Sequence, residues 1–232
     1  MIALTPGEHA ALEKLEERER TVRRGPTLQR ENDPGIELFI LRKGMMMSSV
    51  LLDDGSRQIL RFQFPGDMIA VSALVYREAP ETITALTDAV VCPFERSAMS
   101  RLISGHPRLA ALILVYSQIE RATLTDRLAA LGRTSAKARV AAILLEICNR
   151  TRIFDKGAGN SFTLGLTQEE IGDATGLTAV HVNRMLRQLE EEGVIARAAG
   201  RLTLTDEHAL ARAAKFVDRH VGLDLSWLPA GR

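Results

Sequence analysis

The chain has 232 residues, of which 46% are hydrophobic and 25% are charged, a composition typical of globular proteins. This composition excludes a disordered, collagenous or disulfide-framework protein. The formal net charge of +1 gives no global sign of a nucleic-acid or membrane binder, so any basic surface must be local. The length predicts two modest domains.

The two cysteines, Cys92 and Cys148, stand far apart without a CxxC pair, and we expect both to be buried structural thiols. We predict no metal site and no cofactor. The apolar run that includes residues 110–116 is too short to span a membrane, and the start of the chain lacks the apolar region of a signal peptide. We therefore expect a cytoplasmic protein with no membrane partner.

The N-terminal part combines one short helix with many short strands. Thr5 as N-cap and Glu8 in the capping-box position predict a helix that continues over residues 9–18. From about residue 20 to 94, short β-type runs alternate with turn residues, which predicts an antiparallel β-barrel. The clearest hairpin joins residues 45–52 to 57–64 through Asp53-Asp54-Gly55.

The pattern then becomes helical, with a short helix over residues 95–103 and a long one over 107–131. The long helix carries two apolar stripes, so it needs two partners: the barrel and a second copy of the chain. A helix packed only within its own domain is the alternative. A break at residues 132–134 precedes a further helix from Ala136 to about Thr151, capped by Thr134 or Ser135. The stripe predicted to form the dimer interface consists of Leu112, Tyr116, Ile119 and Thr123.

Residues 166–187 carry the most specific pattern. Thr167 with Glu170 forms a capping box, Gly176 permits a turn with positive φ, and Thr178 can cap a second helix. Gly172 is small where two helices must approach closely. Together these features predict a helix-turn-helix, with an apolar core supplied by Ile171, Leu177, Val182 and Leu186.

The second helix of such a motif enters the DNA major groove. Arg184 is the best base reader because its fork can bond O6 and N7 of a guanine together. We expect base contacts from Val180, Asn183 and Arg184. The expected phosphate contacts are Thr167, Gln168, Thr178, His181, Arg187, Arg197 and Arg201.

A small hairpin follows, with strands at 194–196 and 202–204 and a turn at Ala198-Ala199-Gly200, and it predicts the wing of a winged helix. A final helix is expected from Asp206 to about His220. The acidic run 190–192 is expected to point away from DNA.

The barrel with its Pro65-Gly66-Asp67 turn, the long helix and the sequence LTQEEIGDATGLTAVHVNRMLRQLEEEGVI over 166–195 resemble the Crp/Fnr superfamily of bacterial transcription regulators. The resemblance implies an α+β chain with three parts: a cyclic-nucleotide-binding-like jelly-roll sensor (1–106), a dimerisation helix (107–132) and a winged helix-turn-helix domain (133–232). It also implies a homodimer on a pseudo-palindromic site in double-stranded DNA, and a contact with RNA polymerase if the protein is an activator. Many relatives carry Glu where this chain has Val180.

The sensor departs from that family pattern. Gly66-Asp67 stands for the Gly-Glu that meets the ribose of cyclic AMP, and Glu81 and Thr82, after Pro80, stand for the pair that holds its phosphate. Because Glu81 would repel a phosphate, we expect that cyclic AMP is not the effector. An effector pocket would be lined by Gly66, Asp67, Glu81 and Thr82. The chain has no cysteine before Cys92, so the N-terminal iron–sulfur site of the Fnr branch is excluded.

Three alternatives stay open at this point. The sensor can be gated by haem or another small ligand, with His9, His106 or Cys92 as notional haem ligands. The protein can also bind DNA constitutively, and nothing in the sequence separates this from ligand gating. A cupin-like metal enzyme is the distant alternative, which the lack of histidine between His9 and His106 argues against.

Overall fold

The computed structural model describes residues 4–35, 37–155 and 157–230. The chain forms two compact units. The first contains residues 1–50, 62–123 and 219–232, and the second contains residues 51–61 and 124–218. Each unit is described by itself.

The first unit begins with α1 (Pro6–Glu13), and the predicted capping box is confirmed. The Glu8 N–H donates to Thr5 Oγ1 at 3.3 Å, and the Thr5 N–H donates to Glu8 Oε2 at 2.8 Å. The prediction that this helix extends to Arg18 is wrong. The N–H groups of Leu15 and Glu16 bond to carbonyls only three residues back, so the α-helical ladder ends in a tight turn.

Residues 20–95 form two antiparallel four-stranded sheets, as the turn pattern predicted, and residues 57–61 of the edge strand β5 are assigned to the second unit. The predicted hairpin is confirmed as β4 and β5, with Gly55 at φ 82° in its turn. The first sheet has the order β1 (Arg20–Val22), β8 (Ala89–Glu95), β3 (Glu37–Lys43), β6 (Met68–Ile69). The second has the order β2 (Thr27–Gln29), β7 (Thr82–Ala85), β4 (Met46–Leu51), β5 (Arg57–Gln63), and a short 3₁₀ helix, η1 (Val71–Leu74), follows β6.

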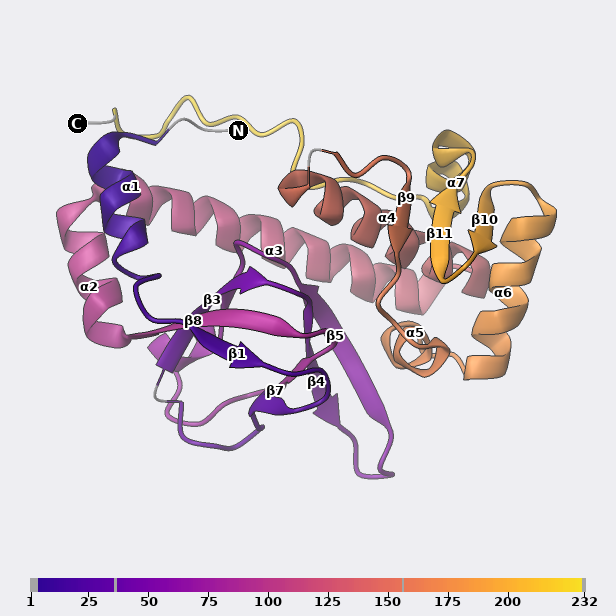
Figure 1. Ribbon diagram of the computed structural model, residues 1–232, viewed down its shortest axis with the longest axis horizontal. Helices are drawn as coiled ribbons and strands as arrows, with labels where there is room; N and C mark the ends of the chain where they lie inside the picture. Colours follow the sequence, from indigo (N-terminus) through magenta and orange to yellow (C-terminus); the bar gives the residue numbers. More distant parts are fainter. Residues whose placement is uncertain (1–3, 36, 156, 231–232) are drawn as a thin grey trace. The chain divides into compact units, whose positions relative to one another are not determined.

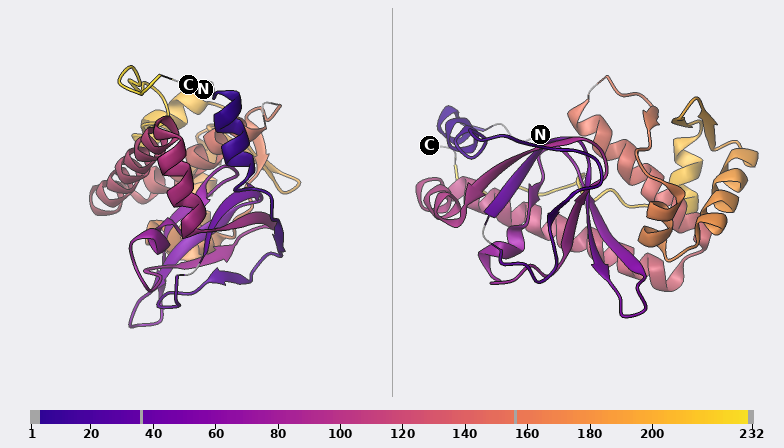
Figure 2. Two further views of the ribbon diagram at one scale, coloured as in Figure 1. Left: turned by 90° about the vertical axis from the view of Figure 1, so that its left-hand side faces the viewer. Right: turned by 60° about the horizontal axis from the view of Figure 1, so that its bottom comes forward.

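Two hydrophobic clusters hold this unit together. One lies between the sheets and joins Phe39 and Leu41 of β3 to Met46 of β4 and Ile83 of β7. The other lies where helices cover the first sheet. There, α1, α2 (Arg96–Gly105) and the start of α3 (Pro107–Arg133) lie side by side (Figures 1 and 2). Its buried members include Leu38, Phe94, Leu102 and Leu109.

The second unit contains α4 (Ala136–Phe154), for which Ser135 is the N-cap, with its side chain accepting from the Ala138 N–H. It continues through β9 (Ser161–Thr163), α5 (Gln168–Thr175), α6 (Ala179–Glu191), β10 (Ile195–Ala198), β11 (Arg201–Leu204) and α7 (Glu207–Ala214).

The predicted wing is confirmed as β10 and β11, and β9 adds a third strand on the far side of β11 (Figure 1). No strand was predicted at β9. The prediction that the last helix reaches His220 is wrong, since Lys215 adopts a left-handed conformation at φ 51° and ends α7. Among the described residues, no helix combines the length and apolar character needed to cross a membrane.

Candidate DNA-binding interface

The predicted helix-turn-helix is present as α5 and α6. The capping box of α5 is complete, with the Glu170 N–H donating to Thr167 Oγ1 at 3.1 Å and the Thr167 N–H donating to Glu170 Oε2 at 2.6 Å. Gly176 ends α5 at φ 66°, a conformation that glycine adopts without steric cost. Thr178 then caps α6 by accepting from the His181 N–H at 3.3 Å. These contacts set where each helix begins and ends.

Close packing fixes the turn between the two helices. A Cβ atom on Gly172 would lie 2.4 Å from the Leu177 carbonyl oxygen, so only glycine fits there without a shift of the backbone. The Leu177 N–H donates to the Gly172 carbonyl at 3.1 Å. Ile171, Val182 and Leu186 are buried beneath the turn as predicted, and Leu177 is half-buried.

The outward face of α6 carries the predicted base contacts. Val180 is 79% exposed, Arg184 is exposed and Asn183 is half-buried. Arg184 has no hydrogen-bond or ion-pair partner among the described residues. Its guanidinium can therefore bond a ligand without first losing a partner inside the protein. His181 and Arg187 are also exposed on this helix, and His181 Nδ1 lies 3.3 Å from Thr178 Oγ1.

At the C-terminal end of α6, two carboxylates, those of Glu190 and Glu192, are paired with basic side chains. Glu190 Oε2 accepts from Arg197 of β10 at 2.5 Å, and this bond holds the pKa of Glu190 below its ordinary value. Glu192 accepts from Lys137 Nζ of α4 at 2.7 Å, which likewise lowers the pKa of Glu192. The charge of Arg197, one of the predicted phosphate contacts, is thus partly neutralised by Glu190. This ion pair was not predicted from the sequence.

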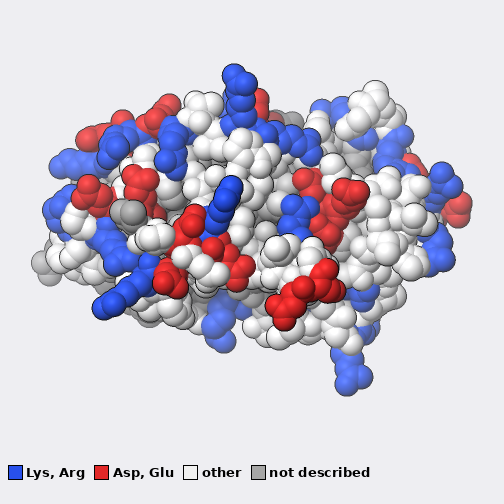
Figure 3. Space-filling model, turned by 90° about the horizontal axis from the view of Figure 1, so that it is seen from below, with Lys and Arg blue, Asp and Glu red and all other residues white. Residues whose placement is uncertain are grey.

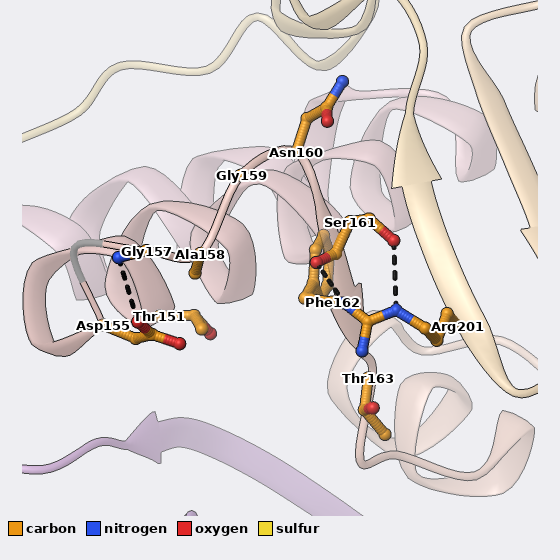
Figure 4. Close-up of a pocket in the computed structure, with 10 residues that line it drawn as sticks. All are labelled: Thr151, Asp155, Gly157, Ala158, Gly159, Asn160, Ser161, Phe162, Thr163 and Arg201. Carbon is orange, nitrogen blue, oxygen red and sulfur yellow. Dashed lines mark hydrogen bonds between the residues drawn. The ribbon is translucent and has the colours of Figure 1, made fainter.

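Arg201, another predicted phosphate contact, is held against β9. Its Nε donates to Ser161 Oγ at 3.2 Å and a terminal nitrogen donates to the Ser161 carbonyl at 2.6 Å (Figure 4). Among the described residues, Arg201 and Asp155 are the ionisable ones that line an open pocket of about 500 Å³. Asp155 Oδ1 accepts the Gly157 N–H at 3.0 Å. Both charged groups thus hydrogen-bond within the local fold. The pocket is lined by Thr151, Asp155, Gly157, Ala158, Gly159, Asn160, Ser161, Phe162, Thr163 and Arg201.

Surface charge does not by itself mark a binding face. Basic and acidic side chains are intermixed over the face shown in Figure 3, in keeping with the net charge of +1. The candidate interface therefore rests on individual residues of α6 and on the N-termini of α5 and α6, where the helix dipole favours phosphate.

Helix α3 presents two different faces. Leu109 is buried and Leu112 packs against the helical cluster of the first unit. Leu114, Leu124 and Leu128 are 54%, 42% and 72% exposed, and at 100° per residue they lie on the face opposite Leu112. The predicted interface residues Leu112, Tyr116, Ile119 and Thr123 are all half-buried. In this chain taken alone, the outward apolar stripe is the one through Leu114 and Leu128.

The four predicted effector residues lie at the ends of strands in different sheets. Gly66, at φ 84°, and Asp67 form the turn before β6, and Asp67 Oδ2 accepts the Phe64 N–H at 2.9 Å. Glu81 precedes β7, and Thr82 begins it and accepts the Glu31 N–H at 3.0 Å. The side chains of Asp67 and Thr82 thus stabilise loops of the sensor itself.

Cys92 and Cys148 are both buried and unpaired, as predicted, and burial raises the pKa of each thiol. Within the described ranges, no three His, Cys, Asp or Glu side chains are grouped so that they could hold a metal ion.

Comparison with known proteins decides the family. Residues 138–213 match the model of the Crp-like helix-turn-helix domain, and residues 19–106 match that of the cyclic nucleotide-binding domain. The nitrogen fixation regulation protein FixK of Bradyrhizobium diazoefficiens is 33% identical over 183 residues, which cover 78% of this chain and 76% of that protein. The chain belongs to the Crp/Fnr family of transcription regulators.

Other Crp/Fnr proteins extend the likeness over most of the chain. The fumarate and nitrate reduction regulatory protein of Escherichia coli is 26% identical over 216 residues, covering 92% of this chain and 86% of that protein. The structure of FixK2 from Bradyrhizobium japonicum superimposes with a TM-score of 0.74 at 26% identity, covering 84% of this chain and 96% of the other. Crp/Fnr regulators bind DNA and act as dimers. The chain is a DNA-binding transcription regulator and not an enzyme.

Proposed function

We propose that α6 is the recognition helix of this regulator and that it lies in the major groove of a pseudo-palindromic operator. The observation that carries this proposal is Arg184, which is exposed and has no partner among the described residues, on a helix whose opposite face is buried. Base contacts come from Val180, Asn183 and Arg184. Phosphate contacts come from Thr167, Gln168, Thr178, His181, Arg187, Arg197 and Arg201.

Two arginine variants test this placement. Arg184→Ala removes a contact of about 1–3 kcal/mol and should relax discrimination at one guanine in each half-site. Arg187→Ala should weaken binding to all DNA alike, because a phosphate contact carries no sequence information. Fluorescence anisotropy with an operator and with scrambled duplex separates the two. If Arg184→Ala bound its operator as tightly as the wild type at the same salt concentration, the placement of α6 would be wrong.

We propose that α3 forms the dimer seam in a functional division of 1–106 as sensor, 107–132 as dimerisation helix and 133–232 as DNA-binding domain. The predicted seam is Leu112, Tyr116, Ile119 and Thr123. The exposure of Leu124 and Leu128 favours the stripe on the opposite face of α3 as a second candidate, since apolar side chains along one helix face are suited to a coiled-coil partner.

Ile119→Glu and Leu128→Glu distinguish the two stripes. A charge in the seam loses its hydration and should dissociate the dimer, whereas a charge that stays in water should have little effect. Analytical ultracentrifugation of both variants identifies the stripe, with Arg133→Gln at the end of α3 as a control. A dimer that survived both substitutions would remove α3 from the interface.

We propose that the sensor does not answer to cyclic AMP. The position expected for a phosphate clamp holds Glu81 after Pro80, and a buried phosphate without a cationic partner carries a large desolvation cost. The sensor is then a platform for α3 or a site for an unidentified apolar ligand, and a haem-gated sensor is the alternative. Calorimetric titration with cyclic AMP and cyclic GMP, beside operator binding, tests this. Micromolar binding of either nucleotide, coupled to tighter DNA binding, would overturn this proposal.

We expect the regulator to act in the bacterial cytoplasm, where its DNA lies, and to contact RNA polymerase if it activates transcription. An in vitro transcription assay on a promoter carrying the operator tests the second expectation.

A further inference from the structure

Val180 is the apolar exception on the outward face of α6. The other large apolar side chains of this helix are buried: Val182, Met185, Leu186 and Leu189 are between 0% and 8% exposed. Val180 is 79% exposed in the first turn, directly after the Thr178 cap and the half-buried Ala179. A valine so exposed contributes nothing to the hydrophobic core, so its apolar surface is available to a partner.

The neighbour of Val180 on the helix surface is Arg184. Residues four apart in a helix lie on the same face with their Cβ atoms about 5–6 Å apart. An apolar branched group is therefore presented beside a guanidinium fork that has no partner in the part of the chain that the structure describes. That pair suits two adjacent base pairs, one offering an apolar group and the other the two acceptors of guanine.

We infer that Val180 reads the 5-methyl group of a pyrimidine in the base pair adjacent to the guanine read by Arg184. This inference rests on the proposed role of α6. The thymine methyl is the apolar group that base pairs display in the major groove, and apolar side chains contact it. Cytosine at that position offers an amino donor, for which valine has no acceptor. 5-Methylcytosine carries the same methyl group as thymine, so the helix should tolerate it there.

The test removes the methyl group and nothing else. An operator is first selected from random duplex DNA with the full-length wild-type protein. Each thymine of one half-site is then replaced in turn by deoxyuridine. One replacement, beside the critical guanine, should weaken wild-type binding about fourfold, equivalent to ~0.8 kcal/mol for one buried methyl-sized group. The operator with cytosine at the same position should bind the protein more weakly than the operator with 5-methylcytosine.

Val180→Ala should abolish the difference between thymine and deoxyuridine at that position. Val217→Ala, which truncates another exposed valine outside α6, should preserve it. The inference is overturned if no deoxyuridine replacement weakens wild-type binding, or if Val180→Ala keeps the full methyl effect. Arg184→Ala distinguishes a failure of the role of Val180 from a failure of the proposed role of α6. If it weakens operator binding while deoxyuridine has no effect, only the role of Val180 fails. If it too has no effect, the proposed role of α6 fails as well.

Discussion

The outward face of α6 and the effector positions of the sensor differ in how their polar groups are used. On α6, Arg184 is exposed and has no partner among the described residues. In the sensor, Asp67 accepts the Phe64 N–H and Thr82 accepts the Glu31 N–H. The comparison teaches that Arg184 can bind an external partner without giving up a bond to another described residue. The Asp67 and Thr82 oxygens already accept loop N–H groups, so only their remaining hydrogen-bonding capacity is available to a ligand.

The largest expected effect comes from filling the space at Gly172. Gly172→Ala would place Cβ 2.4 Å from the Leu177 carbonyl, and relieving such overpacking typically costs about 1–3 kcal/mol. We expect a lower melting temperature for the second unit and a loss of operator binding. Gly132→Ala in α3 meets no atom within 4 Å and should keep or raise stability. Thermal unfolding followed by circular dichroism compares them. Equal melting curves would show that the turn does not need this close approach.

A smaller effect is expected where α6 meets the wing. Glu190→Gln releases Arg197 from its ion pair, so Arg197 gains freedom to bind a phosphate. Binding to any duplex should tighten, and the slope of log K against log salt should steepen by about 0.9 for each half-site in which the released Arg197 gains a phosphate contact. Glu191→Gln removes the same charge from the neighbouring exposed residue. If both variants changed the slope equally, the effect would come from net charge and not from Arg197.

The smallest effect concerns the pair of Lys137 and Glu192. The ammonium group lowers the pKa of the Glu192 carboxyl, so this pair stabilises the fold above the ordinary glutamate pKa. That contribution is lost as pH falls through the lowered, folded-state pKa. The melting temperature of Glu192→Gln should be slightly below that of the wild type at pH 6, and the gap should close toward pH 3. The pair is exposed, so a gap that is independent of pH would assign no role to the ion pair.

The parts that short-range rules govern were predictable from sequence. The capping residues Thr5, Thr167 and Thr178 and the turn at Gly176 act within a few residues of themselves, and all take their predicted roles. The prediction failed where pairing with a distant strand creates an element, or where a single residue without a strong sequence signal ends a helix. Strand β9 has three residues and exists because it pairs with β11, and α7 ends where Lys215 turns left-handed.

The candidate site shows the same division. Local periodicity placed Val180 and Arg184 on the exposed face of α6, and the structure agrees. The ion pair of Glu190 with Arg197 joins a helix to a strand of the wing, so no spacing rule within one element indicates it. The choice between the stripes of α3 also lay beyond the sequence, because both repeat with helical spacing and only packing shows which one faces the chain's own core.

The central claim is that this regulator reads DNA through α6 in two symmetric copies. Its most direct test is to select operators from random duplex DNA with the wild-type protein and with Arg184→Ala, and to sequence the bound pools. The wild type should enrich two inverted half-sites about 10 base pairs apart from centre to centre, each with a defined guanine. The variant should retain the spacing and lose that guanine. Enrichment of the same guanine by Arg184→Ala, or of a single unpaired half-site by the wild type, would contradict the account.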